Sequence, residues 1–230
     1  MMRYAIYFAP QQASLFDTLG SSWLGRNAYN DKSVQQPAIN GLAAATSEPA
    51  RYGFHATLKA PFSLKPSQRR TVLGEKTQQL AKQLNQVTIA NLTLTAEHGF
   101  IALVPEQRQI TVAQLADRCV RELDEFRGAE DEEKLAQRRV GLSERQRKYL
   151  DAWGYPYVFD DFNLHFSLTK ALSAPDLDRL LPEARKHFAP VIGRSLKIDS
   201  LSIFVEPAPG ANFTIEEQFP IRSTLRTTST

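Results

Sequence analysis

The sequence has few of the features that mark secreted, membrane or zinc-binding proteins. Cys119 is the single cysteine in 230 residues, which excludes an internal disulfide framework and every cysteine-based zinc motif, and fits a reducing compartment. No run of 18 uncharged apolar residues occurs, and the N-terminal segment lacks the apolar stretch of a signal peptide. We therefore expect a soluble, cytoplasmic protein with no membrane partner.

The chain also lacks a strong charge of either sign, since 28 Lys and Arg are set against 25 Asp and Glu. A net charge of +3, dispersed along the chain, does not by itself indicate binding to duplex nucleic acid. No Gly-x-Ser-x-Gly elbow, P-loop or dinucleotide fingerprint is present. At 42% hydrophobic residues, the composition predicts a folded chain of one large domain or two small lobes.

Hydrophobic periodicity predicts a mixture of helices and strands. Apolar residues at helical spacing predict helices over 13–24, 67–85, 111–127 and 173–188. Apolar and alternating runs predict strands over 3–9, 92–96, 100–104, 162–169, 201–205 and 213–215.

Several local features refine this prediction. Residues 25–50 show little periodicity and are predicted to form a long loop. Ser143 and Gln146 match a capping box ahead of a short helix, and Pro182 is expected to kink or split the helix that contains it. Cys119 is interpreted as a core residue, and 223–230 as a frayed tail.

The two halves of the chain repeat one order of elements. Each half has an extended segment that carries a histidine, then an amphipathic helix, then a hairpin pattern. This order indicates an internal duplication, and a single repeat is too few for a solenoid. We expect one bilobal domain over 1–230 with interleaved lobes.

The duplication places the same short motif in both halves. His55, Thr57 and Leu58 match His165, Ser167 and Leu168 in the pattern His-x-hydroxyl-Leu. Because side chains alternate along a strand, each motif presents an imidazole and a hydroxyl on one face. If the two strands face each other across a cleft, one imidazole can take a proton while the other gives one, and the hydroxyls can donate to phosphate oxygens.

The other two histidines have structural explanations. His98 lies in a predicted hairpin turn, and His187 lies near a helix C-terminus, where the helix dipole favours histidine. His55 and His165 are therefore the catalytic candidates, with Thr57 and Ser167 as phosphate-binding candidates.

Two blocks, 51–62 and 153–169, resemble the signature blocks of the 2H phosphoesterase superfamily. Within it the chain is most similar to a branch of unknown function associated with phosphonate metabolism. The resemblance implies an α+β, bilobal, duplicated fold in which two antiparallel sheets face a central groove with helices outside. It also implies metal-free chemistry on a small cyclic phosphate, with no cofactor.

The branch further suggests a phosphoribosyl 1,2-cyclic phosphate as substrate. Residues beside the motifs could bind its second phosphate or its sugar: Arg51, Tyr52, Lys59, Tyr157 and Lys170. On an unbroken strand Lys59 would share the face of His55 and Thr57.

Three alternatives stay open. An enzyme that processes RNA 2′,3′-cyclic-phosphate ends has the same reacting group, although the even charge makes nucleic acid the less favoured partner. A non-catalytic nucleotide-binding module is a second possibility. A metal hydrolase with His55, His165 and Asp160 or Asp161 as ligands is a third, although the sequence lacks His-Glu-x-x-His. We expect a monomer.

Overall fold

The computed structural model describes residues 1–223, so the predicted tail lies outside it from residue 224 onward. The strands are β1 (Arg3–Phe8), β2 (Ala56–Phe62), β3 (Val87–Ile89), β4 (Leu92–Thr95), β5 (Ala102–Pro105), β6 (Phe166–Ser167), β7 (Leu196–Ile198), β8 (Ser200–Glu206) and β9 (Thr214–Pro220). The α-helices are α1 (Leu15–Leu24), α2 (Leu42–Tyr52), α3 (Arg70–Gln83), α4 (Ile110–Glu122), α5 (Glu132–Arg139), α6 (Glu144–Trp153) and α7 (Ala174–Phe188). Two short 3₁₀ helices are η1 (Asp124–Phe126) and η2 (Phe159–Asp161). No helix within residues 1–223 has both the length and the hydropathy needed to cross a bilayer.

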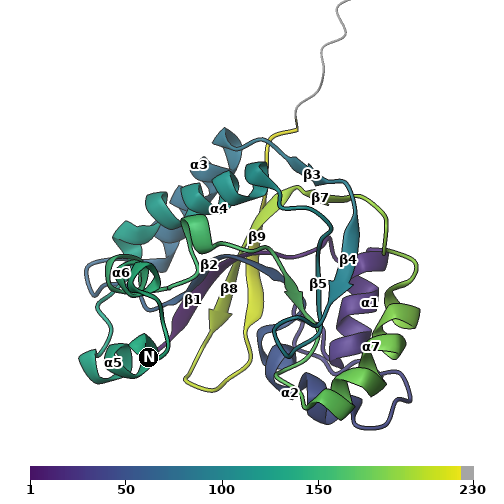
Figure 1. Cartoon of the computed structure of the whole chain (residues 1–230). Helices are drawn as coiled ribbons and strands as arrows, with labels where there is room; N and C mark the ends of the chain where they lie inside the picture. Colours follow the sequence, from purple (N-terminus) through teal and green to yellow (C-terminus); the bar gives the residue numbers. More distant parts are fainter. Residues whose placement is uncertain (224–230) are drawn as a thin grey trace, which may run out of the picture.

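Seven strands form one sheet in the order β4-β5-β6-β2-β1-β8-β9 (Figure 1). Every neighbouring pair in this sheet is antiparallel. The predicted α+β class is therefore confirmed. The structure differs from the expectation in one respect, because the two halves do not form separate facing sheets. They are joined edge to edge where β2 pairs with β6.

The predicted repeat of element order is visible in the topology. The first half runs β2, α3, β3 and the β4–β5 hairpin, and the second runs β6, α7, β7 and the β8–β9 hairpin. Equivalent strands pair with each other, β2 with β6 and β3 with β7. The first hairpin extends the sheet beside β6, whereas the second lies beyond β1 on the side of β2. The two halves are thus interleaved.

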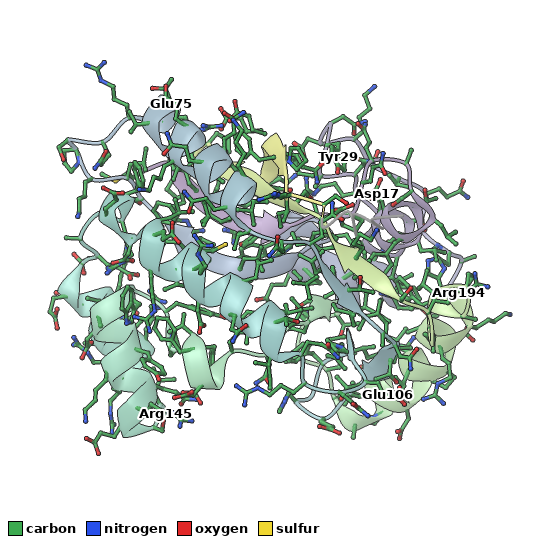
Figure 2. All side chains as sticks on the ribbon, turned by 90° about the horizontal axis from the view of Figure 1, so that it is seen from above. Asp17, Tyr29, Glu75, Glu106, Arg145 and Arg194 are labelled. Carbon is green, nitrogen blue, oxygen red and sulfur yellow. The ribbon has the colours of Figure 1, made fainter. Side chains whose placement is uncertain are left out.

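Strand β1 shows how the sheet separates a thick core from a groove. Tyr4, Ile6 and Phe8 point into the main hydrophobic core, which includes residues of α1, α3, α4 and α7. Ala5 and Tyr7 point to the opposite face, into a small aromatic cluster. Seen from above, α3 and α4 lie across the sheet (Figure 2). The face away from these helices is therefore available for a site.

Three sequence expectations need correction. Residues 25–50 are not all loop, because α2 begins after Gly41 and buries a narrow stripe of Leu42, Ala45 and Pro49 that carries little hydrophobic signal. Helix α7 is continuous through Pro182 and is not split. The extended segment 162–169 contributes only a two-residue strand, β6. The capping box of Ser143 and Gln146, in contrast, is confirmed at the start of α6.

Candidate active site

The pairing of β2 with β6 brings the two motifs together. Ala56 lies opposite Phe166, and both side chains are fully buried in the core. An antiparallel register continued by one residue places His55 across from Ser167 and Thr57 across from His165. Because side chains alternate along a strand, these motif side chains lie together on the other face of the sheet. The motifs therefore lie side by side on neighbouring strands, not across a cleft from each other as expected.

Both histidines are oriented by the same local bond. His55 Nδ1 lies 2.8 Å from the carbonyl oxygen of Gly53, and His165 Nδ1 lies 2.9 Å from that of Asn163. A carbonyl oxygen can only accept, so Nδ1 carries the proton in each ring. Nε2 is then the nitrogen left for proton transfer. In His55 it lies 3.3 Å from Thr57 Oγ1, which donates to it.

Gly53 is needed for this arrangement. Its φ of 78° lies in the left-handed region, and a Cβ at this position would come within 2.5 Å of the Ala28 side chain. Only glycine therefore fits at the turn that presents the carbonyl oxygen to His55.

The ring of His55 is stacked on Tyr7, with ring centroids 3.7 Å apart and an angle of 15° between the planes. Phe204 lies against the same imidazole, at 5.8 Å between centroids. This packing shields much of the ring from water and lowers the pKa of His55 to about 3, an effect that the nearby His165 increases and the bond to Gly53 opposes. His55 is therefore neutral at physiological pH.

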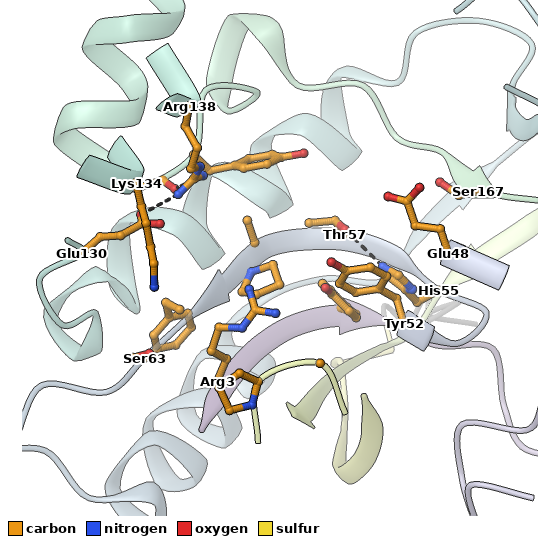
Figure 3. A pocket seen from close by; sticks show the side chains of 18 of the residues that line it. Arg3, Glu48, Tyr52, His55, Thr57, Ser63, Glu130, Lys134, Arg138 and Ser167 are labelled. Carbon is orange, nitrogen blue, oxygen red and sulfur yellow. Dashed lines mark hydrogen bonds and ion pairs between the residues drawn. The ribbon is translucent and has the colours of Figure 1, made fainter. Parts of the chain in front are cut away.

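The motif opens into a groove of about 940 Å³ (Figure 3). His55, Thr57 and Ser167 line it directly. His165 lines a much smaller adjoining pocket, which shares Thr57 with the groove. The groove is large enough for a small phosphorylated molecule.

Lys59 does not reach the groove. A register irregularity between β1 and β2 pairs Tyr7 with Thr57 but Ile6 with Lys59, which turns Lys59 to the helix-covered face. There Lys59 is 3% exposed, and its Nζ lies 2.8 Å from Asp124 Oδ1. The expectation that Lys59 shares the face of His55 is wrong, because the strand is interrupted by this bulge.

The other substrate-binding candidates divide into two groups. Tyr52 and Lys170 line the groove. Tyr157 is 47% exposed and lines the small pocket beside His165. Arg51 lies outside the groove lining, where it forms an ion pair with Glu206. Arg51 is thus placed for a structural role.

Sequence reasoning missed several groove residues. Tyr7, which supports His55, could have been found from the alternation of β1, because Arg3, Ala5 and Tyr7 share one face. Lys134 and Arg138 come from α5 and are far from both motifs in sequence, so no local pattern indicated them.

The metal-hydrolase alternative would need a cluster of metal ligands, and residues 1–223 provide none. Within residues 1–223, no three His, Cys, Asp or Glu side chains come together in a way that could hold a metal ion. Asp161 instead pairs with Arg145 at 2.6 Å, and Asp160 accepts a hydrogen bond from the Tyr149 hydroxyl at 3.2 Å.

Comparison with protein families identifies the relatives of the chain. Residues 57–214, which hold Thr57 and the whole second motif, match the family described as "Protein of unknown function (DUF1045)". The chain belongs to this family. The expected relationship to a family of unknown function is thus confirmed.

Two curated relatives of this DUF1045 chain are both called "Ribose 1,5-bisphosphate phosphokinase PhnN". The protein from Laribacter hongkongensis (strain HLHK9) is 38% identical over 92% of this chain, and that from Janthinobacterium sp. (strain Marseille) is 36% identical over 96%. The matched regions are 50% and 51% of their lengths, so the chain spans about half of each relative.

Solved structures with a similar fold include LigT from E. coli in complex with NADP+ and a protein described as a phosphoesterase. The LigT complex is 12% identical with a TM-score of 0.43, over 96% of this chain and 97% of LigT. The phosphoesterase is 12% identical with a TM-score of 0.44, over 96% of this chain and 98% of that protein. At these values the likeness does not bear on the activity of the DUF1045 chain.

Proposed function

We propose that the protein is a metal-independent phosphodiesterase that opens a small cyclic phosphate by acid/base catalysis. The observation that carries this proposal is the β2–β6 register, which gathers two imidazoles and two hydroxyls on one face of the sheet. The fixed proton on Nδ1 of both rings supports it, because each Nε2 is then free for proton transfer. The resemblance of the two motif blocks to 2H phosphoesterases agrees with this chemistry.

The different surroundings of the two histidines suggest their roles. His55 is held neutral by burial, so its Nε2 acts as the general base that takes a proton from the attacking water. A bond forms between the water oxygen and phosphorus, and one ring P–O bond breaks. His165, protonated on Nε2 as well as on Nδ1, gives its Nε2 proton to the departing oxygen. Ser167 donates a hydrogen bond to a non-bridging oxygen, and the Thr57 hydroxyl turns from His55 Nε2 to donate to another.

The relatives' name suggests a substrate in phosphonate catabolism. Both curated relatives are called kinases of ribose 1,5-bisphosphate. Opening of 5-phosphoribosyl 1,2-cyclic phosphate at the bond between phosphorus and O2 leaves phosphate on O1, which gives that compound. We therefore propose this cyclic phosphate as the substrate and this bond as the one broken.

Phosphorus NMR of the purified protein with 5-phosphoribosyl 1,2-cyclic phosphate tests the proposal. We expect the cyclic resonance to be replaced by that of a 1-phosphate monoester, at the same rate after exhaustive treatment with EDTA. Activity that EDTA removes and zinc restores would support a metal hydrolase instead. Preference for RNA 2′,3′-cyclic ends with steep salt dependence would support RNA processing, and binding without turnover would support a nucleotide-binding module.

A further inference from the structure

The groove has a second, basic end that this chemistry does not use. Arg3 from β1 and Lys134 and Arg138 from α5 line it. Figure 3 shows these side chains gathered on the side of the groove away from His55 and Ser167. Strand β1 and helix α5 therefore both place cationic side chains at this end of the groove.

The ion pairs of these cations show which of them are available to a ligand. Lys134 forms no ion pair with any acid among residues 1–223, and its side chain is exposed. Arg138 is already held by Glu130 at 2.5 Å. Of the two acids in this part of the groove lining, Glu130 is thus paired, and Asp131 accepts hydrogen bonds from backbone N–H groups at the start of α5. Of Arg138 and Lys134, Lys134 is therefore the cation more available to bind an anionic ligand.

Arg3 is held in place by one of its nitrogens and keeps the others available to a ligand. Its Nε binds Glu206, whose side chain is fully buried and which also binds Arg51. The two terminal nitrogens of Arg3 take no part in that bond. The pKa of Arg3 is raised chiefly by Glu206 and to a smaller degree by the nearby Tyr52 hydroxyl, which lines the same groove. The guanidinium is thus a charged, oriented donor.

The spacing of the two ends fits one small molecule. Arg3 lies four residues from Tyr7 on the same face of β1, about 13 Å along the strand. Tyr7 lies beneath His55, and the Arg3 side chain points into the groove from the other end (Figure 3). A sugar ring with anionic groups on two sides can therefore contact both ends.

We propose that Arg3 and Lys134, with Arg138 beside them, bind a phosphate monoester that the substrate carries remote from its cyclic phosphate. This inference rests on the proposed function, and it deepens it by defining the substrate class as a phosphorylated sugar that also carries a cyclic phosphodiester. It replaces Lys59 and Arg51, which do not line the groove, as ligands of the second phosphate.

The test compares two substrates, 5-phosphoribosyl 1,2-cyclic phosphate and the same molecule without the 5-phosphate. Wild-type protein prefers the first, and Lys134→Gln lowers the ratio of the two kcat/KM values by about 10- to 100-fold, because one charge-assisted phosphate bond is lost. Lys134 is exposed, so this variant folds. Lys148→Gln is the matched control: Lys148 lies on α6, is exposed and pairs with Glu144, and it leaves the ratio unchanged. An unchanged ratio in Lys134→Gln, or an equal loss on both substrates, overturns the inference.

Calorimetric titration with ribose 5-phosphate distinguishes failure of the phosphate site from failure of the proposed phosphodiesterase activity. This probe carries the phosphate monoester but no cyclic phosphate. If Lys134→Gln weakens its binding at least tenfold while neither cyclic compound is turned over, the phosphate site stands and the proposed function fails. If the cyclic phosphates are opened but neither the ratio nor the binding depends on Lys134, the function stands and the phosphate site fails.

Discussion

His55 lies flat on the ring of Tyr7, 3.7 Å away between centroids; Tyr7 belongs to β1, and His55 directly precedes the neighbouring strand β2. Tyr7 is 1% exposed, so the tyrosine forms a rigid support beneath the imidazole. The stack, the bond from Nδ1 to Gly53 and the bond from Thr57 fix the ring from three directions. Nε2 of His55 is thereby held at the groove before any substrate binds.

Removal of Tyr7 is expected to impair catalysis because the His55 ring is no longer held in position, although the proton-transferring group itself is kept. Tyr7→Ala lowers kcat/KM about 100-fold, because a misplaced base loses its alignment. It also raises the pKa of His55 toward its ordinary value, since water reaches the ring. Tyr7→Phe keeps the stacked ring and retains most of the activity. NMR titration of His55, together with steady-state kinetics, checks both effects, and an unchanged pKa in a folded Tyr7→Ala protein would contradict the assigned role.

The lowered pKa of His55 also predicts how stability depends on pH. The value in the folded protein, about 3, lies below the ordinary 6.5. Between these values the unfolded chain binds a proton that the folded chain does not, so the free energy of unfolding falls as the pH decreases. From about pH 7.5 to about pH 4.5, urea denaturation of the wild type loses more stability than that of His55→Gln. An equal loss in both proteins would show that His55 titrates normally.

Because Lys59 and Asp124 form a buried ion pair, replacing Asp124 is expected to cost more stability than replacing Lys59. Asp124→Ala leaves the buried Lys59 ammonium with no carboxylate partner, only the Val120 carbonyl oxygen at 3.4 Å, and costs about 3–5 kcal/mol of stability. Lys59→Met costs less, because Asp124 keeps its bond to Arg127 at 2.8 Å. Urea denaturation gives both values. Lys59→Met retains full activity, since Lys59 does not line the groove, and a folded but inactive variant would contradict this.

The two motif hydroxyls are expected to contribute less than the imidazoles. Thr57→Ala and Ser167→Ala each remove one donor to the phosphate and lower kcat/KM roughly 10- to 10³-fold. Thr57→Ser and Ser167→Thr keep the donor and serve as matched controls. If the alanine variants and these controls are equally active, the hydroxyls do not contact the transferred phosphate.

Much of the fold could be predicted from sequence because its signals are local. The apolar residues of α4 recur at regular helical spacing in the sequence, and α6 begins at the capping box of Ser143. The paired motifs around His55 and His165 could be recognised for the same reason, since each spans only four consecutive residues.

The parts that could not be predicted depend on contacts between distant segments. Nothing near Lys59 indicates that a bulge turns it away from the groove. The direct pairing of Ala56 with Phe166, which makes the two motif strands neighbours, is a long-range contact. Lys134 reaches the groove only because α5 folds back toward β1 (Figure 1).

The most direct test of the two-histidine mechanism is kcat/KM on 5-phosphoribosyl 1,2-cyclic phosphate for His55→Ala, His165→Ala and the double variant, with folding checked by circular dichroism. Loss of a general acid or base costs about 10²- to 10⁴-fold, so each single variant is nearly inactive. The double variant is little worse than either, because both rings act in one step. If either folded single variant keeps more than about a tenth of wild-type activity, that histidine is not catalytic and the mechanism is wrong.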